Sequence, residues 1–250
     1  MRIVFLGNNR VAVESLRWLK EQGAEIVGLV VHPEGKRRFA EELIEIAALP
    51  ASRVCQAPQL RDPECLRQIG EWQPDLGLSV YFGYILKREF LDLFPRGVIN
   101  LHPSLLPYNR GAHPNVWSIV ERTPAGVSLH YVDQGIDTGD LVAQREIGVL
   151  PWDTGFTLYE KLEKGAVELL QENWPAISRG AASRLPQPVD AGTSHVTKDV
   201  ARLDCIDLER SYQGRELIDL LRARTFPPYR NTYFQENGRR VFLRLELDPE

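Results

Sequence analysis

Short runs of apolar residues alternate, over the first 180 residues, with segments whose apolar positions recur every three or four residues, as at Val11, Leu16 and Leu19. The apolar runs have the length of buried strands, and the segments between them have the spacing of amphipathic helices. Strands are predicted at Arg2–Leu6, Glu25–Val31, Leu76–Val80, Val98–His102, Gly126–Val132 and Leu141–Ile147, and helices at Arg10–Glu21, Lys36–Ala48, Lys87–Leu93, Asn115–Glu121 and Thr157–Ile177. This alternation is typical of an α/β protein with a mostly parallel, Rossmann-like sheet that carries helices on both faces.

The pattern changes towards the end of the chain. Residues 178–195 lack periodicity and contain many small residues, which predicts a connector. A short helix is predicted at Gly214–Arg224. Two alternating segments, Tyr229–Phe234 and Val241–Leu247, flank Asn237-Gly238, and Asn-Gly between such segments predicts a β-hairpin.

Composition narrows the class of protein. The chain has 250 residues, of which 43% are apolar and 26% charged, as in packed globular proteins. A formal net charge of -4 argues against a general nucleic-acid binder. No apolar run has the length of a membrane span, and the N-terminal MRIVFLG has the pattern of a first strand rather than a signal peptide. Because Cys55, Cys65 and Cys205 lack metal-binding spacing, we expect a cytoplasmic protein with reduced, structural thiols.

The strand predicted at Val98–His102 ends on polar residues. Side chains two apart on a strand point to the same face, so Asn100 and His102 lie together. Pro103 cannot extend a central strand, and ligands of open α/β sheets bind at the carboxyl ends of strands. An amide donor and a titratable ring at this edge indicate a candidate catalytic site, although a polar strand end that satisfies its own loop is an alternative.

Three further segments are candidates for binding. Gly7–Arg10 joins the first strand to the first helix, where free backbone donors would suit a phosphate, but an ordinary turn explains it equally well. Ser79–Leu86 is apolar and could line a flat pocket for an aromatic ligand or pack into the core. Asp133–Asp140 has the pattern of a hairpin turn and lacks the spacing of a calcium loop. No cluster of His and Cys residues is present in the sequence, so no bound metal is expected.

Four of these segments, FLGNNR, YFGYIL, NLHPSLLPYNRG and GIDTGDLVAQ, together and in this order, resemble the motifs of the folate-dependent formyltransferases. That family includes methionyl-tRNA formyltransferase, phosphoribosylglycinamide formyltransferase and the sugar-nucleotide N-formyltransferases. RGAHPNVW and FPPYRNTYF resemble the sugar-nucleotide branch most. The resemblance implies a formyltransferase catalytic domain over residues 1–180, followed over 181–250 by a connector, a short helix and the hairpin.

The resemblance also implies the reaction and its participants. The formyl donor would be 10-formyltetrahydrofolate, no metal would be needed, and the acceptor would be the amine of a nucleotide-linked amino sugar. A 4-amino-4,6-dideoxyhexose is the favoured sugar, as in lipopolysaccharide O-antigen biosynthesis. The expected catalytic residues are Asn100, His102 and Asp137. The folate donor is expected near Tyr84, Ile85, Leu86, Gln134 and Gly135. The acceptor is expected near Gly7, Asn8, Asn9, Arg10, Tyr81 and Pro103.

The chemistry of formyl transfer fits the expected catalytic residues. A neutral amine attacks the formyl carbon, and negative charge develops on the formyl oxygen. Asn100 can donate a hydrogen bond to that oxygen, as can a protonated His102. His102 is the residue best placed to titrate near neutrality, and Asp137, if folded beside it, would favour the imidazolium. The sequence leaves open whether His102 or a water, together with Asp137, removes the proton of the amine.

Three alternatives stay open at this point: methionyl-tRNA formylation, glycinamide-ribotide formylation, and a folate-binding protein of the same fold without turnover. The transfer-RNA enzymes carry a full barrel after the catalytic domain, whereas one hairpin is predicted here. From Ala201 to Glu250, nine arginines balance nine acidic residues, so this segment lacks the positive charge expected for RNA binding. Because an isolated hairpin is marginal in water, we also expect it to help build a homodimer.

Overall fold

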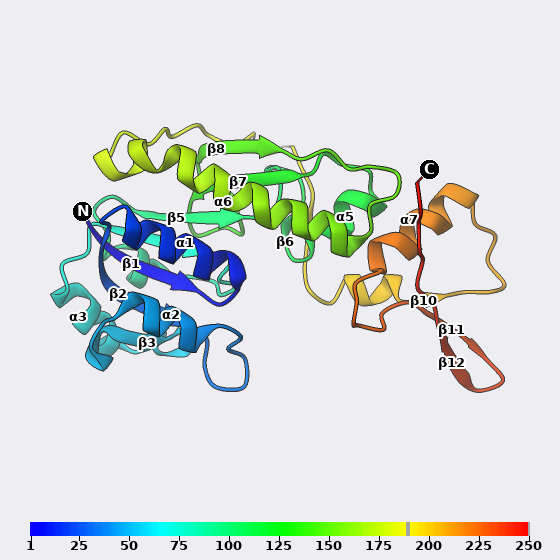
Figure 1. Cartoon of the computed structure of the whole chain (residues 1–250), viewed down its shortest axis with the longest axis horizontal. Helices are drawn as coiled ribbons and strands as arrows, with labels where there is room; N and C mark the ends of the chain where they lie inside the picture. The colour runs from blue at the N-terminus through cyan, green and yellow to red at the C-terminus, as the bar shows by residue number, and fades with distance from the viewer. Residues whose placement is uncertain (189–190, 250) are drawn as a thin grey trace. The chain divides into compact units, whose positions relative to one another are not determined.

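The computed structural model describes residues 1–188 and 191–249, so Val189 and Asp190 of the predicted connector, and Glu250, lie outside the described residues. The α-helices are Arg10–Glu21 (α1), Ala40–Ala47 (α2), Pro63–Glu71 (α3), Arg88–Leu91 (α4), Pro114–Val120 (α5), Gly155–Arg179 (α6) and Gly214–Arg224 (α7). The strands are Arg2–Gly7 (β1), Glu25–Val31 (β2), Val54–Gln56 (β3), Leu76–Val80 (β4), Val98–His102 (β5), Arg110–Gly111 (β6), Gly126–Tyr131 (β7), Leu141–Glu146 (β8), Ser194–His195 (β9), Cys205–Ile206 (β10), Tyr233–Glu236 (β11) and Arg239–Phe242 (β12). Short 3₁₀ helices lie at Ala51–Arg53, Ala57–Arg61 and Val200–Leu203. Figure 1 follows these elements along the chain.

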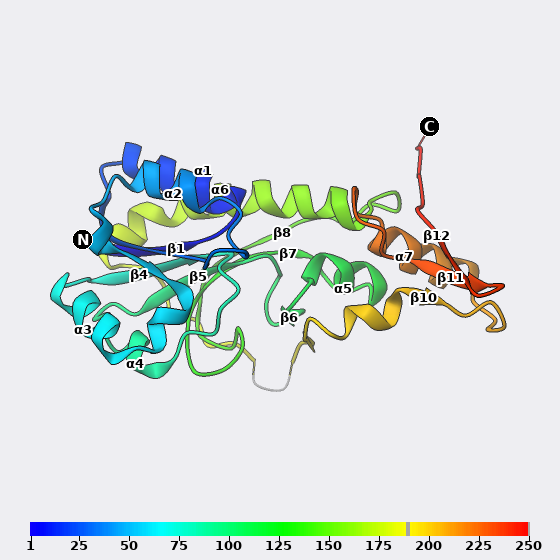
Figure 2. The same ribbon diagram turned by 90° about the horizontal axis from the view of Figure 1, so that it is seen from below.

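The central sheet has seven strands in the order β3-β2-β1-β4-β5-β7-β8. The strands from β3 to β5 pair in parallel, whereas β7 pairs with β5 in the antiparallel sense. Figure 2 shows α1 and α2 on one face of the sheet and α3 and α4 on the other. The predicted fold class, a mostly parallel α/β sheet with helices on both faces, is therefore confirmed. Since the chain passes from β3 back across the sheet to β4, the order reverses between β1 and β4, and such a reversal marks the usual ligand crevice.

The first helical layer differs from the prediction at α2. The helix was predicted from Lys36 but begins at Ala40. The preceding loop is fixed by Asn8, whose amide nitrogen donates to the carbonyl oxygen of Lys36 at 3.3 Å and whose amide oxygen accepts from the N–H of Arg38 at 3.1 Å. A long-range contact of this kind has no signal in the local pattern. The short strand β3 and the helix α3 had no predicted counterparts.

The C-terminal hairpin is confirmed in type and shifted in its boundaries. Its strands are Tyr233–Glu236 and Arg239–Phe242, shorter than predicted. The turn is Asn237-Gly238, with φ angles of 48° and 71°, as a tight hairpin turn requires. A third strand, β10, pairs with β11 and completes a small sheet in the order β10-β11-β12. The long helix α6 extends the predicted helix by two residues at each end.

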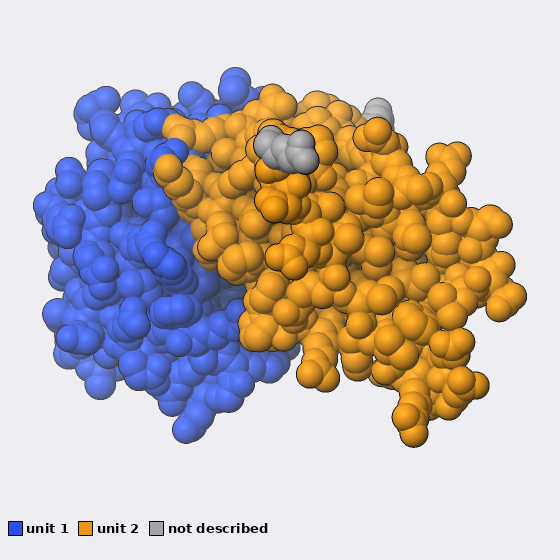
Figure 3. Space-filling view, turned by 45° about the vertical axis from the view of Figure 1, so that its right-hand side comes forward, with its two compact units in different colours: residues 1–102, 128–144, 166–187 blue, residues 103–127, 145–165, 188–250 orange. Residues whose placement is uncertain are grey.

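The chain forms two compact units, coloured separately in Figure 3. Unit 1 contains residues 1–102, 128–144 and 166–187, and unit 2 contains residues 103–127, 145–165 and 188–250. The predicted division into domains over residues 1–180 and 181–250 stays a prediction.

Unit 1 has an apolar core on one face of its sheet. This core includes Val4, Leu6, Ile69 and Phe90, each at most 1% exposed. The thiols of Cys55 and Cys65 also lie there, with their sulfur atoms 3.5 Å apart. Burial raises the pKa of Cys55 to about 12, so this thiol is unreactive at neutral pH.

Unit 2 is held by a buried polar network next to the contact of α5 with α7. The carboxylate of Asp219 accepts from Arg122 at 2.8 Å and from Arg222 at 2.7 Å. Arg222 also donates to the carbonyl oxygens of Leu150 and Asp153. The two buried charges, Asp219 and Arg222, therefore have partners, which a charge removed from water requires.

No helix within residues 1–188 and 191–249 combines the length with the apolar character that a membrane span would need.

Candidate active site

A row of polar side chains crosses three adjacent strands of unit 1. Ser79 on β4 pairs in register with Asn100 on β5, and Asn100 pairs with His130 on β7. The hydroxyl of Ser79 donates to the amide oxygen of Asn100 at 2.8 Å, and the amide nitrogen of Asn100 lies 3.1 Å from Nε2 of His130. Asn100 is therefore held from both sides, and its amide orientation is fixed by its neighbours.

The hydrogen bonds of His130 define which of its nitrogens carries the proton. Nδ1 of His130 lies 2.9 Å from the carbonyl oxygen of Tyr131. Because a carbonyl oxygen only accepts, Nδ1 is the donor of that pair, and Nε2 is the nitrogen that faces the amide of Asn100. One N–H of the Asn100 amide is thus engaged by His130, and its second N–H is the one that can serve a substrate.

Asp137, in the loop between β7 and β8, lies close to two histidine side chains. Its carboxylate lies 3.6 Å from Nδ1 of His102 and 3.5 Å from Nε2 of His130. Both histidine side chains are less than 10% exposed, and that of Asp137 is 16% exposed. Its φ angle of 54° falls in the left-handed region, which residues with a β-carbon seldom adopt. The structure therefore brings the three predicted catalytic residues together at the edge of the sheet, while their roles stay a prediction.

The cluster can carry out proton transfer and stabilise an oxyanion. An amide N–H, two imidazoles and a carboxylate lie within hydrogen-bonding or ion-pair range of one another. An imidazole beside a carboxylate is suited to general acid–base catalysis. A fixed amide donor is suited to stabilising charge on a reacting oxygen.

Sequence reasoning missed His130 and Ser79. The signal for His130 was present, since Ser128 and His130 alternate with apolar residues in GVSLHY and share one face of β7. Ser128 pairs in register with His102 and its hydroxyl accepts from the side-chain amide of Gln144 at 2.9 Å, so a second polar row lies beside the first.

The loop after β4 carries the residues predicted to lie near the folate donor. Tyr84 is half-buried and meets the ring of His32 edge-on, with centroids 4.8 Å apart. Ile85 is 64% exposed, whereas Leu86 is 6% exposed and belongs to the apolar core. Tyr81, predicted on the acceptor side, is half-buried with a φ of 50°. The loop thus leaves Ile85 exposed and Tyr84 partly exposed, while Leu86 anchors it in the core; their contact with the folate donor stays a prediction.

His32 supports this loop from the end of β2. Its Nε2 contacts the carbonyl oxygen of Phe82. Burial lowers the pKa of His32 below its ordinary value, so the ring is neutral and Nε2 donates to Phe82. His32 therefore holds the loop through one hydrogen bond and through its ring contacts with Phe82 and Tyr84.

Gln134 and Gly135 are exposed in the loop that carries Asp137. The N–H of Gly135 donates to Asp133 at 2.9 Å, and the hydroxyl of Thr138 donates to the same oxygen at 2.7 Å. A β-carbon at Gly135 would lie 2.0 Å from Thr138, so the turn requires glycine. The two predicted residues therefore sit on a closed turn that presents Asp137.

In the turn Gly7–Arg10, the side chains of Asn8 and Asn9 already make hydrogen bonds within the protein. The side chain of Asn8 is engaged with the loop before α2, and that of Asn9 caps α1 by accepting from the N–H of Ala12 at 3.0 Å. Arg10 is exposed and pairs with Glu14 at 2.8 Å. Gly7 pairs with Val80 of β4, so the turn lies at the reversal of strand order. Pro103 follows His102 directly and is half-buried.

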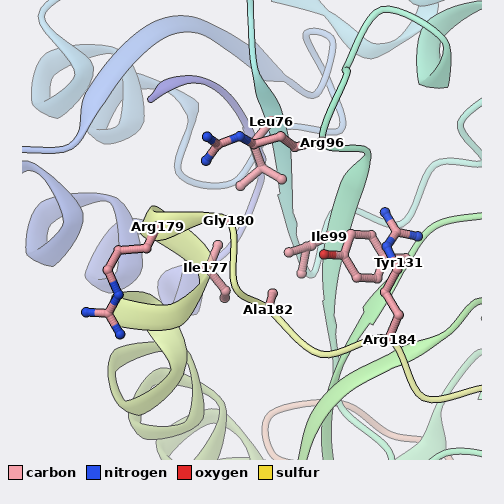
Figure 4. A pocket seen from close by; sticks show the side chains of 9 residues that line it. All are labelled: Leu76, Arg96, Ile99, Tyr131, Ile177, Arg179, Gly180, Ala182 and Arg184. Atoms are coloured by element: carbon pink, nitrogen blue, oxygen red, sulfur yellow. The ribbon is translucent and has the colours of Figure 1, made fainter.

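A separate hollow of about 230 Å³ lies at the opposite ends of β4 and β5. Its floor includes Leu76, Ile99 and Tyr131. Figure 4 shows that the guanidinium of Arg184 lies over Tyr131 while that of Arg179 points away. This hollow contains none of the predicted site residues.

Among the residues that the structure describes, no group of three or more His, Cys, Asp or Glu side chains has an arrangement that could hold a metal ion.

The fold and the polar cluster define an α/β protein with histidine, carboxylate and amide side chains gathered at the carboxyl end of β5. Residues 1–173 match the family model described as formyl transferase, and residues 199–249 match the one described as N-formyltransferase dimerization C-terminal domain. The chain belongs to the formyl transferase family, and it is a formyltransferase. Methionyl-tRNA formyltransferase of Acetivibrio thermocellus is 32% identical over 100% of this chain and 81% of that protein.

Solved structures of similar proteins include sugar N-formyltransferases. A 4-N formyltransferase from Francisella tularensis has a TM-score of 0.84 and 29% identity, covering 100% of this chain and 98% of that one. The formyltransferase PseJ from Anoxybacillus kamchatkensis has a TM-score of 0.61 and 29% identity, covering 90% of this chain and 99% of that one. PseJ was solved in complex with UDP-4,6-dideoxy-4-formamido-L-AltNAc and tetrahydrofolate.

Proposed function

We propose that this chain transfers a formyl group from 10-formyltetrahydrofolate to the amine of a nucleotide-linked amino sugar, with a 4-amino-4,6-dideoxyhexose as the preferred acceptor. The observation that carries the proposal is the likeness to the Francisella tularensis 4-N formyltransferase over the whole chain. The match of residues 199–249 to an N-formyltransferase dimerization domain supports the same branch.

The proposed mechanism assigns a role to each polar residue of the cluster. When bound, the folate donor supplies the electrophilic formyl carbon. The second N–H of Asn100 donates to the formyl oxygen as negative charge develops there, a contribution of ~3 kcal/mol for one such donor. Ser79 and His130 fix the orientation of the amide, because they are hydrogen-bonded to its oxygen and to its first N–H.

In this proposal, His102 and Asp137 transfer the proton from the attacking amine to the departing folate nitrogen. The amine loses a proton as it attacks, and the departing folate nitrogen gains one. Nδ1 of His102 faces the carboxylate of Asp137, so an imidazolium formed there has a counter-charge 3.6 Å away. Nε2 of His102 is then the nitrogen that can exchange a proton with the amine, either directly or through a water.

The acceptor can be identified by a direct comparison. We expect mass spectrometry to detect a gain of one formyl group on a nucleotide-linked 4-amino-4,6-dideoxyhexose incubated with the enzyme and 10-formyltetrahydrofolate. The panel should include 3-amino sugars, several nucleotides, glycinamide ribotide and methionyl-tRNA. Formylation of methionyl-tRNA with no sugar modified would overturn the proposed acceptor. Folate binding without formylation of any acceptor would favour a non-catalytic protein.

Methionyl-tRNA formylation is the second candidate, because the 32% identical relative named above catalyses that reaction by name. The charge of the C-terminal segment favours an amino sugar over methionyl-tRNA as the acceptor. Nine arginines and nine acidic residues between Ala201 and Glu250 leave no net positive charge for a phosphate backbone.

Arg10→Ala is predicted to weaken binding of the acceptor more than binding of the folate donor. The proposal puts the acceptor's phosphates at the Gly7–Arg10 turn, where Arg10 is an exposed cation at the start of α1. We expect the KM of the nucleotide sugar to rise about two- to fivefold, the size of an exposed charge contact, with the folate KM unchanged. Arg17→Ala, an exposed arginine of the same helix, is the matched control. Equal losses for both substrates would argue against this placement.

A homodimer is predicted to form through the C-terminal segment. Large apolar side chains are exposed there, including Tyr229, Val241 and Phe242, at 54%, 42% and 43%. We expect light scattering to give the mass of a dimer at micromolar concentration, and Phe242→Glu to shift it towards the monomer by at least tenfold in Kd. Val196→Glu, an apolar position 44% exposed outside the hairpin, should leave the dimer intact. A monomeric native protein would contradict the prediction.

A further inference from the structure

A buried residue of the connector, Gln187, is hydrogen-bonded to the loop that carries Asp137. Its side-chain nitrogen donates to the carbonyl oxygen of Asp137 at 2.9 Å and to that of Gly139 at 2.7 Å. Gln187 is only 8% exposed. We infer that Gln187 is a positioning residue, which holds Asp137 in the conformation that directs its carboxylate towards His102 and His130. The inference rests on the catalytic role proposed for Asp137.

The backbone of Asp137 requires such support. Its φ of 54° lies in a region that a residue with a β-carbon keeps only where surrounding contacts hold it. Gly139 is packed so closely on β7 that a β-carbon would lie 2.0 Å from the carbonyl oxygen of Tyr131. The loop therefore meets β7 at Gly139 and the connector at the carbonyl groups of Asp137 and Gly139.

The connector reaches the loop through a short antiparallel bridge. The N–H of Leu141 donates to Leu185 at 2.8 Å, and the N–H of Leu185 donates to Leu141 at 3.0 Å. This register puts Gln187, two residues after Leu185, opposite Gly139, two residues before Leu141. The guanidinium of Arg184, 3.5 Å from the ring centre of Tyr131, fastens the same segment to β7 (Figure 4).

Both ends of the loop have restraints of their own. Asp133 accepts from Gly135 and Thr138 at the start of the loop. The N–H of Tyr131 donates to the carbonyl oxygen of Asp140 at 2.8 Å at its end. Gln187 adds a restraint at Asp137 itself. Its removal should therefore free the catalytic carboxylate while the ends of the loop stay in place.

The substitution Gln187→Met tests this role, because it removes both donors and keeps the length of the side chain. We expect hydrogen exchange in residues 134–139 to become faster and kcat to fall about 10- to 100-fold with KM nearly unchanged, since a displaced catalytic group costs this much. The assay uses 10-formyltetrahydrofolate and the acceptor found in the panel. Gln68→Met, which removes an exposed glutamine amide that donates to Glu64 within α3, should keep kcat within about twofold of the native value. Unchanged exchange together with unchanged kcat in Gln187→Met would overturn the inference.

One further variant separates positioning from packing. Gln187→Asn keeps an amide donor on a shorter side chain, so its kcat should lie between those of the native and Met enzymes. A Gln187→Asn enzyme as slow as Gln187→Met would assign the loss to packing and overturn the inference. If Gln187→Met does not fold, hydrogen exchange is measured on Gln187→Asn instead. Exchange over residues 134–139 should then be faster than in the native enzyme. Native exchange rates would overturn the role of Gln187.

A double-mutant cycle distinguishes this inference from the proposed function. In an Asp137→Asn background, Gln187→Met should lower kcat by less than about twofold, because its effect passes through the lost carboxylate. Independent, multiplying losses would overturn the inference. Full activity of Asp137→Asn alone would overturn the catalytic role of Asp137 instead. A slow Asp137→Asn enzyme with a normal Gln187→Met enzyme would overturn only the role of Gln187.

Discussion

Replacing Asn100 by Ala is expected to lower kcat for formyl transfer by about 100- to 1,000-fold, the loss typical for one oxyanion donor. The KM of the folate donor should change little, because the amide acts on charge that is present mainly in the transition state. Single-turnover kinetics with 10-formyltetrahydrofolate and the identified acceptor measure the chemical step directly.

Asn173→Ala is the matched control for this experiment. The amide of Asn173 also donates a hydrogen bond, to the carbonyl oxygen of Leu169 at 2.8 Å, but it does so within α6. The control enzyme should have native kinetics. An Asn100→Ala enzyme with native kcat would rule out the oxyanion role, and an equal loss in kcat and folate affinity would point to a structural effect.

Asp137→Asn is predicted to have the larger effect, a fall in kcat of about 1,000-fold or more, as for the orienting carboxylate of other acid–base catalysts. The substitution keeps the shape of the side chain but removes the negative charge that lies 3.6 Å from His102 and 3.5 Å from His130. An imidazolium formed during proton transfer would then lack its counter-charge. The pH dependence of kcat and the melting temperature should both be measured.

Asp92→Asn controls for the loss of one carboxylate elsewhere. Asp92 pairs with Arg88 on the surface, with both side chains more than 60% exposed, so this variant should resemble the native enzyme. A melting temperature of Asp137→Asn close to the native value would assign the loss to chemistry. Retention of more than about a tenth of native kcat by a folded Asp137→Asn enzyme would contradict the role assigned to it.

Local patterns determined the elements that position the site. The alternation of strands and helices predicted the parallel sheet, and the period of two along β5 put Asn100 and His102 on one face. The turn at Asn237-Gly238 was predicted because a tight hairpin needs residues that tolerate positive φ angles. Features of this kind depend on residues close together in the sequence.

The motif resemblance, not the local pattern, selected Asp137. Its acidic, glycine-containing segment has the pattern of a hairpin turn, and its contacts join residues 35 and 7 positions apart along the chain, to His102 and His130. The family match to residues 1–173 agrees with that resemblance.

The tertiary structure alone decided which neighbours serve the site. Ser79 and His130 meet Asn100 only because β4 and β7 flank β5, and β7 joins the sheet in the antiparallel sense. Asn8 and Asn9, which look free to bind a ligand in the sequence, are engaged by a loop and a helix end. Gln187 comes from a connector without any periodicity, and its two hydrogen bonds span 50 and 48 residues. Local signals therefore sufficed to predict the fold class and the polar residues of β5. The partners of those residues depend on strand order, register and long-range hydrogen bonds, which local spacing does not encode.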